Sequence, residues 1–211
     1  MSRASNPKAP DWSLEEQLWR RSVSPVAGVD EAGRGALAGP VVAAAVILPP
    51  GERYPFRDSK TLTVARRAHL ADEVRTVALA WAVGQASALE VDTLNVLGAT
   101  KLAARRAVAA LSVAPAGLVT DYLKLGTPLP EVAVARGDSL SYQIAAASIL
   151  AKTVRDALMT ALHERYPAYG FARHKGYGAP EHLNALARVG ACSEHRTTFG
   201  PVAQRALFAV K

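Results

Sequence analysis

Four acidic residues stand where their carboxylates could hold a divalent cation. Asp30 and Glu31 end a short apolar run, Asp121 closes another, and Asp138 precedes a long helical pattern. A carboxylate removed from water must be paired with a base or must coordinate a metal, and no base adjoins the Asp30–Glu31 pair. Ligand sets made of oxygen suit hard ions such as Mg²⁺ or Mn²⁺. The sequence therefore predicts a site for such an ion.

A basic turn follows the first two acids directly. In Gly33-Arg34-Gly35, an arginine is flanked by glycines that leave the backbone bare. Such a turn can bring a guanidinium and backbone N–H groups close to a phosphate-bearing ligand. We therefore expect a metal and a polyanion to meet at one point.

Alternating strand and helix patterns must position these groups. The apolar patterns predict strands over residues 26–29, 41–48, 80–85, 118–121 and 131–135, and helices over residues 13–21, 64–77, 91–111 and 139–163. The first helix has a capping-box pattern, Ser13-Leu14-Glu15-Glu16. Strands interleaved with helices favour an α/β layer fold. If strands 26–29 and 118–121 are neighbours, their carboxylates meet at the sheet edge where such folds bind ligands.

Three of the acids need further conditions. Successive strand residues point to opposite faces, so Asp30 and Glu31 can share a centre only if the strand ends there and the chain bends. Asp138 could instead cap the long helix. Asp156 on that helix would lie ~27 Å from Asp138 if the helix were unbroken. We expect Asp156 to pair locally with Arg155 or another base.

The composition is that of a globular protein with an excess of positive charge. Half of the 211 residues are hydrophobic, and 25 Lys and Arg against 18 Asp and Glu give a net charge of +7. We expect a disordered tip over residues 1–10 and one domain over 11–211. The longest uncharged run, residues 35–51, contains a proline and is too short to span a membrane. A lone cysteine, Cys192, fits a reducing compartment, so we expect a cytoplasmic protein. We also expect a monomer.

The basic residues gather near the C-terminus. From residue 165 to 211 there are seven basic residues and two acids. Such a region is typical of an electrostatic footprint for nucleic acid. A solvated surface that aids solubility explains the charge equally well.

Several separated motifs together resemble one family, ribonuclease HII, the bacterial type 2 ribonuclease H. The motifs are GVDEAGRG (28–35), LAGPVVAAAVIL (37–48), DSK (58–60), LNVLGAT (94–100), GDS (137–139), AAASILAKTVRD (145–156), YGFARHKGYG (169–178) and HRTTFGP (195–201). The resemblance implies a ribonuclease H-like three-layer fold, with a mixed five-stranded sheet flanked by helices and a helical, basic C-terminal part from about residue 165.

The resemblance also implies roles for particular residues. It places the metal carboxylates at Asp30, Glu31, Asp121 and Asp138, and recognition of the ribonucleotide 2′-hydroxyl at Gly33, Arg34 and Gly35. It places Tyr177 against the sugar at the RNA–DNA junction, and it makes Lys60 and Lys175 phosphate contacts. The 2′-hydroxyl is the group that distinguishes a ribonucleotide from its deoxy neighbour.

The chain departs from the family pattern at three positions. Ala36 replaces a proline and Ala179 a threonine, and Tyr122 stands where a glycine usually follows the third carboxylate. A backbone angle specific to glycine would be costly for tyrosine, so we expect the loop after Asp121 to differ.

The expected reaction is hydrolysis of the phosphodiester 5′ to a ribonucleotide, in RNA–DNA hybrid or duplex DNA, with two Mg²⁺ or Mn²⁺ ions ~3.5–4 Å apart. The products would be a 3′-hydroxyl and a 5′-phosphate. A hybrid-binding protein without catalysis and a nuclease that acts on DNA alone remain as alternatives. The segment Gln204 to Phe208 resembles the peptide that docks on the bacterial sliding clamp, although a terminal amphipathic turn explains it as simply.

Overall fold

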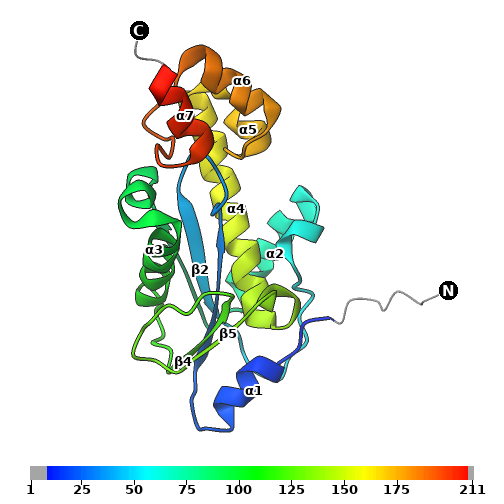
Figure 1. Cartoon of the computed structure of the whole chain (residues 1–211). Helices are drawn as coiled ribbons and strands as arrows, with labels where there is room; N and C mark the ends of the chain where they lie inside the picture. The colour runs from blue at the N-terminus through cyan, green and yellow to red at the C-terminus, as the bar shows by residue number, and fades with distance from the viewer. Residues whose placement is uncertain (1–8, 209–211) are drawn as a thin grey trace, which may run out of the picture.

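A mixed five-stranded sheet forms the centre of the molecule (Figure 1). The computed structural model describes residues 9–208, with side chains to residue 204. The strands, β1 (Val26–Ala32), β2 (Val41–Ile47), β3 (Ala80–Ala86), β4 (Gly117–Asp121) and β5 (Glu131–Val134), lie in the order β3-β2-β1-β4-β5. β1 pairs antiparallel with β2 and parallel with β4. β2 and β3 are antiparallel, whereas β4 and β5 are parallel.

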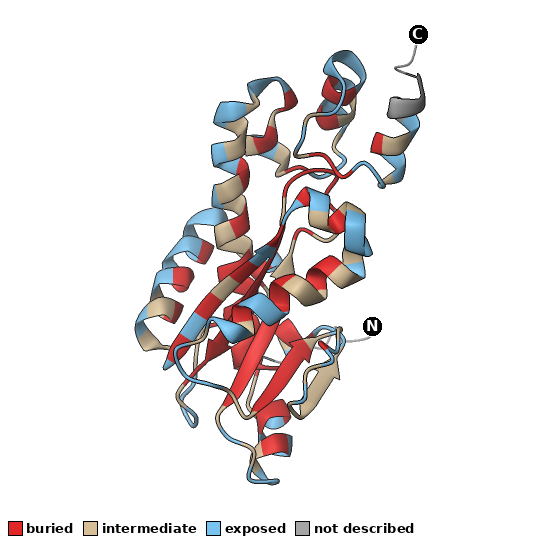
Figure 2. Cartoon of the chain, turned by 90° about the vertical axis from the view of Figure 1, so that its left-hand side faces the viewer, coloured by how far each residue is buried: buried red, intermediate tan, exposed pale blue. Residues whose placement is uncertain are grey.

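Helices cover both faces of the sheet. The main helices are α1 (Ser13–Trp19), α2 (Val64–Val77), α3 (Ala88–Ala109), α4 (Tyr142–Arg165), α5 (Phe171–His174), α6 (Pro180–Val189) and α7 (Gly200–Phe208). Short 3₁₀ turns occupy Ser59–Thr61, Gly137–Ser139 and Pro167–Tyr169. α3 packs on one face, and α2 and α4 pack on the other. Figure 2 shows buried strands between helices whose outer surfaces are exposed. The predicted three-layer α/β fold is confirmed.

Small side chains let α4 approach β1 closely. A Cβ atom on Gly28 would lie 2.3 Å from the backbone carbon of Gln143, so only glycine fits there. The centre of β2 is Ala43, Ala44 and Ala45, all fully buried. This contact fixes one face of α4 against the end of β1, where the acidic pair lies.

α4 also carries the C-terminal part of the chain. Its 24 residues extend ~36 Å, beyond the end of the sheet. There Met159 packs with Phe171, Tyr169, Ala185 and Ala38 in a separate apolar cluster. The C-terminal helices are therefore fixed to α4 and to the loop that follows β1 (Figure 1).

The boundaries differ from the prediction at three helices. The predicted capping box at Ser13 is wrong, because α1 has Trp12 as its N-cap and no side chain caps this end. Glu15 is buried, and its carboxylate accepts a hydrogen bond from Ser141. A complete capping box instead joins Ser87 and Glu90 at the start of α3. α4 begins at Tyr142 with Ser141 as its N-cap, so Asp138 does not cap it.

No helix in the described part of the chain, residues 9–208, is long and apolar enough to cross a membrane.

Candidate active site

A cavity of about 550 Å³ opens where β1 and β4 end. The residues that line it are Asp30, Glu31, Ala32, Gly33, Arg34, Gly35, Ser59, Lys60, Asp121, Ser148, Lys152 and Tyr177. They come from β1 and its following turn, from β4, from α4, and from two loops. The structure therefore brings three of the four predicted metal carboxylates to one cavity.

β1 runs past both acids instead of ending before them. It continues to Ala32, which pairs with Val42 of β2, so the predicted strand end at Val29 is wrong. Pairing with β4 stops at Val29 and Thr120, which opens that side of β1. Glu31 and Asp30 therefore line the same cavity although both lie on the strand.

Asp30 is the most deeply buried of the cavity carboxylates, with 5% of its surface exposed. Burial raises its pKa well above the usual range, and the charges of Glu31 and Asp121 raise it further. The Ser148 hydroxyl and the Glu31 backbone N–H, at 2.7 Å, oppose that shift by hydrogen bonding. A negative charge here is costly unless a cation shares it.

Two other carboxylates already have protein partners. Glu31 accepts a hydrogen bond from the Arg34 guanidinium at 3.3 Å. Burial raises the Glu31 pKa, and Arg34 opposes the shift. Asp121 accepts a hydrogen bond from the Gly137 N–H at 2.8 Å, which connects β4 to the turn that carries Asp138.

Asp138 faces a further acid that the sequence analysis did not single out. The pKa of Asp138 is raised to about 6. Burial is the largest cause, and the charges of Asp58 and Asp121 are the next largest. Burial lowers the pKa of Lys60, but the charges of nearby carboxylates outweigh burial and raise this pKa. These carboxylates are Asp138, Asp30, Asp58 and Asp121, in order of effect. Asp58 also caps the 3₁₀ turn through the Lys60 N–H at 2.8 Å, and its signal in the sequence was its place in the motif DSK.

The turn after β1 needs glycine at one position and leaves another open. Gly33 has φ +96°, and a Cβ atom there would lie 2.0 Å from Arg155 Nε. At Gly35 a Cβ atom would meet nothing within 4 Å. Gly33 is thus required by the fold, whereas Gly35 offers a bare backbone to the cavity.

Two buried arginines that sequence reasoning missed hold this turn. Arg155 and Arg196 are fully buried and donate mainly to backbone carbonyl oxygens. Arg196 reaches Arg34 O at 2.8 Å and Gly39 O at 2.8 Å. Arg155 reaches the carbonyls of Pro40, Ala38 and Lys175. The only sequence signal was a base in the motifs AAASILAKTVRD and HRTTFGP.

Asp156 has partners other than Arg155. It pairs with Lys152 at 2.7 Å and with Arg67 at 2.9 Å. The expectation of a local base is confirmed, and that base is Lys152.

The two predicted contacts from the C-terminal part differ in position. Tyr177 lines the cavity, and Arg155 lies over its ring at 5.2 Å. The Lys175 ammonium instead donates to Ala172 O at 2.6 Å and Thr160 Oγ1 at 3.0 Å. It therefore needs a rotamer change to reach a phosphate in the cavity.

Tyr122 retains the backbone angle that we expected tyrosine to lose. Its φ is +60°, in the left-handed region, and its N–H donates to Val134 O at 2.7 Å. The hydrogen bond to β5 holds the loop after Asp121 in this form. The Tyr122 ring is 63% exposed and carries the Arg34 guanidinium at 5.6 Å.

Comparison with known proteins decides the family. The sequence matches the ribonuclease HII family over residues 27–202. It is 57% identical over 194 residues to ribonuclease HII of a strain of Thermus thermophilus, covering 92% of this chain and 95% of that protein. The chain belongs to the ribonuclease HII family. It is therefore a ribonuclease H, a hydrolase of the nuclease class.

Solved structures of ribonucleases H share its fold. The PCNA:RNase HII complex from Archaeoglobus fulgidus matches with a TM-score of 0.73 and 26% identity, covering 86% of this chain and 96% of that chain. Bst-RNase HIII in complex with Mn²⁺ matches with a TM-score of 0.66 and 20% identity, covering 88% and 70%. The predicted ribonuclease H-like fold is confirmed.

The donor set of this ribonuclease HII site fits a divalent cation. Among the described residues, no three His, Cys, Asp or Glu side chains already enclose a metal position. The Asp121 and Glu31 carboxylates instead accept hydrogen bonds from protein groups. Without an ion, the negative charges of these carboxylates repel one another. A cation would stabilise the charged form of Asp30, whose pKa is raised in its absence. The donors are all oxygen atoms, which suit a hard cation. Asp30, Glu31, Asp121 and Asp138 are the residues that would hold it.

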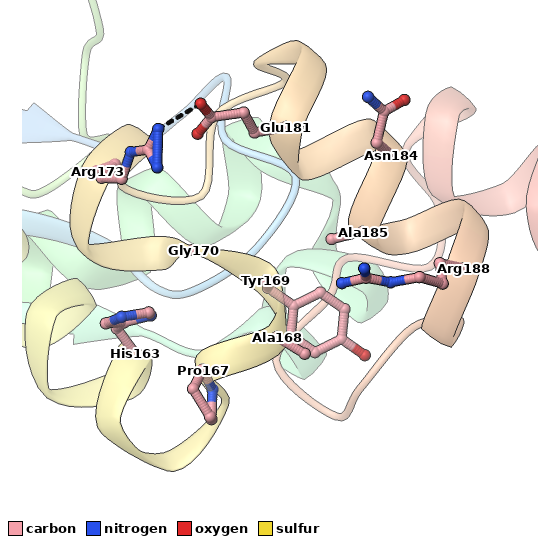
Figure 3. A pocket seen from close by; sticks show the side chains of 10 residues that line it. All are labelled: His163, Pro167, Ala168, Tyr169, Gly170, Arg173, Glu181, Asn184, Ala185 and Arg188. Atoms are coloured by element: carbon pink, nitrogen blue, oxygen red, sulfur yellow. Dashed lines mark hydrogen bonds and ion pairs between the residues drawn. The ribbon is translucent and has the colours of Figure 1, made fainter.

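A second cavity, of about 590 Å³, lies in the C-terminal part of this ribonuclease HII chain (Figure 3). Its lining includes His163, Arg173, Glu181 and Arg188. Glu181, the one carboxylate in the lining, pairs with Arg173 at 2.5 Å. Without a free acid this cavity lacks the ligands for a hard cation, so the cavity at β1 is the candidate active site.

The raised pKa of Asp138 predicts a pH-dependent effect of Asp138→Asn. Folding raises this pKa from 3.8 to about 6, so the charged carboxylate destabilises the metal-free fold as pH rises from about 4 to above 6. In EDTA, the melting temperature of Asp138→Asn should therefore gain on that of the unsubstituted protein between pH 4.5 and pH 7. Comparing the two proteins cancels the titration of groups that do not interact with Asp138. A difference that is constant with pH would contradict the assignment.

Proposed function

We propose that the chain hydrolyses the phosphodiester 5′ to a ribonucleotide, in RNA–DNA hybrids and in duplex DNA, leaving a 3′-hydroxyl and a 5′-phosphate. One juxtaposition carries the proposal: a carboxylate cluster, Asp30, Glu31 and Asp121, shares a cavity with an arginine-glycine turn whose backbone is open. Acids repel a nucleic acid unless cations lie between them. The turn offers donors that can tell a ribose from a deoxyribose.

The site needs no covalent nucleophile from the protein. When bound, two Mg²⁺ or Mn²⁺ ions would supply an activated water and stabilise the leaving oxygen. Asp30, Glu31, Asp121 and Asp138 would hold the ions, and Lys60 offsets part of the negative charge of these carboxylates and contacts phosphate. Gly33, Arg34 and Gly35 bind the ribonucleotide, and Tyr177 packs against the neighbouring sugar. After a rotamer change, Lys175 contacts a phosphate of the substrate in the cavity.

One assay tests this function against its alternatives. A labelled duplex with a single ribonucleotide is incubated with the protein beside its all-DNA counterpart, each with Mg²⁺, Mn²⁺ or EDTA. We expect cleavage of the ribonucleotide duplex alone, at the 5′ side, and only with a divalent ion. Cleavage of both duplexes would indicate a DNA nuclease, and binding without cleavage would indicate a hybrid-binding protein.

The two glycines of the turn predict opposite outcomes for one added methyl group. Gly33→Ala should lower the melting temperature and abolish cleavage, because its Cβ would clash with Arg155 at 2.0 Å. Gly35→Ala should keep the melting temperature, since its Cβ meets nothing within 4 Å, but should raise KM by filling space meant for substrate. Thermal unfolding and steady-state kinetics measure both. Equal melting temperatures for the two variants would contradict this account.

The basic C-terminal part, from about residue 165, would contact further phosphates of the duplex. Each phosphate that it contacts releases counterions, so affinity should fall steeply with salt. A clamp contact through Gln204 to Phe208 remains a prediction, and its side chains after Gln204 lie outside the described residues. The resemblance of the fold to a ribonuclease HII in complex with PCNA supports testing it. A cytoplasmic location and a monomeric state also remain proposals.

A further inference from the structure

Tyr122 combines exposure with a strained backbone at the edge of the candidate active site. It directly follows Asp121, exposes 63% of its surface and has φ +60°. Tyrosine pays a steric cost for this angle that glycine does not, and such strain persists where the surrounding structure imposes it and gathers at functional sites. An exposed aromatic ring gains nothing from the core that would offset this cost.

Hydrogen bonds hold the backbone at Tyr122 in place. The Tyr122 N–H donates to Val134 O at 2.7 Å, and the Leu123 N–H donates to Asp121 O at 2.6 Å. The Asp121 carboxylate is itself fixed by the Gly137 N–H at 2.8 Å. The backbone at Tyr122 is therefore held beside the fixed carboxylate of Asp121.

Arg34 connects this ring to the cavity. Its guanidinium lies 5.6 Å from the centre of the Tyr122 ring and 3.3 Å from the Glu31 carboxylate. Tyr177, which lines the cavity, carries Arg155 over its ring in the same manner at 5.2 Å. Arg34 thus connects Tyr122 to the carboxylate cluster, and Tyr177 lines the same cavity as Arg34.

The chemistry of the ring selects its ligand. In a duplex the faces of the bases are covered by neighbouring bases, whereas sugars are accessible across the wide, shallow minor groove of an A-like helix. An aromatic ring offers an apolar face to a sugar, and the arginine beside it attracts the adjoining phosphate.

We propose that Tyr122 is a second sugar-binding residue, which packs against a nucleotide sugar beside the cleaved bond. This inference rests on the proposed ribonuclease activity. It assigns to Tyr122 a direct contact with substrate, and to Arg34 a phosphate contact next to it.

Kinetics and stability of three variants test the proposal. Tyr122→Ala and Tyr122→Gly should each raise KM for the single-ribonucleotide duplex about tenfold, the order expected for a lost aromatic contact. Their kcat should stay within about twofold, because a contact that is equally strong in the bound substrate and in the transition state affects KM alone. Tyr122→Phe should behave as the unsubstituted protein. Tyr122→Gly should also melt at a higher temperature than Tyr122→Ala, since glycine relieves the strain at φ +60°.

Two control variants match the features of Tyr122 away from the site. Trp81→Ala removes an exposed aromatic that also carries an arginine, Arg75, at 5.6 Å. Ser22→Gly relieves a positive φ of 58° in the turn before β1. Neither should change KM. An unchanged KM in Tyr122→Gly, or a KM raised equally by the Trp81 control, would overturn the proposal.

A double-variant cycle separates direct contact from an effect through Arg34. Tyr122→Ala should still raise KM in an Arg34→Ala background, and no effect there would overturn a direct contact. Fluorescence anisotropy with the same duplex, in an Asp30→Asn background, gives a reading without cleavage. Weaker binding on adding Tyr122→Ala supports the contact, whether or not the unsubstituted protein cleaves this duplex. A lack of cleavage by the unsubstituted protein would refute the proposed function but not the contact.

Discussion

An Asp30→Asn protein should bind its duplex but lose cleavage by on the order of 10³-fold or more, as expected for one member of a group that acts as a unit. Asn keeps the shape of the side chain but cannot supply the negative charge that holds a cation. The fold should be retained in EDTA, because burial already disfavours the charged form of Asp30. Single-turnover cleavage and thermal unfolding measure the two effects.

Asp121→Asn should lose cleavage in the same way. Its carboxylate contacts Gly137 N–H through an oxygen that Asn can retain, so the loop should survive. Asp72→Asn is the matched control, since Asp72 pairs only at the surface with Arg75 and its side chain is 78% exposed. Normal turnover by Asp121→Asn would show that the metal assignment is wrong.

Arg196→Met should cost about 3 kcal/mol of unfolding free energy, because it leaves buried carbonyl oxygens without donors at about 1–3 kcal/mol each. These are the carbonyls of Arg34 and Gly39, which Arg196 contacts at 2.8 Å. Burial, followed by the charge of Arg155, lowers the Arg196 pKa to about 10, so the guanidinium remains charged at neutral pH. Denaturant unfolding measures the loss.

The same substitution should loosen the turn that recognises the ribonucleotide. In Arg196→Met, KM should therefore rise even where the protein remains folded. Arg188→Met, at an exposed position of α6, serves as the control and should stay within about 0.5 kcal/mol of the unsubstituted protein. If the two variants were equally stable, Arg196 would not be the support of the turn.

Much of the fold could be predicted because it follows local apolar patterns. The residues of β2 and β3 show strand periodicity, and the strands are where the pattern places them. The order of the strands in the sheet could not be read from those patterns. The positions of the acids suggested that β1 and β4 are neighbours, and the structure places them side by side. The capping box at Ser13 failed because α1 begins at Ser13 itself, which leaves Trp12 at the N-cap position. The tertiary fold turns the neighbouring Glu15 inward to Ser141, 126 residues away in the sequence.

The sequence by itself determined the chemistry of this protein: which carboxylates and which glycine-arginine turn are present, and that each follows an apolar strand. Only the tertiary structure decided what surrounds them. Asp58, Ser148, Arg155 and Arg196 come from distant segments, and the left-handed angle at Tyr122 depends on its hydrogen bond to β5. Residue type and local pattern are encoded in neighbouring positions, whereas burial, charge coupling and imposed strain arise only when remote segments pack together.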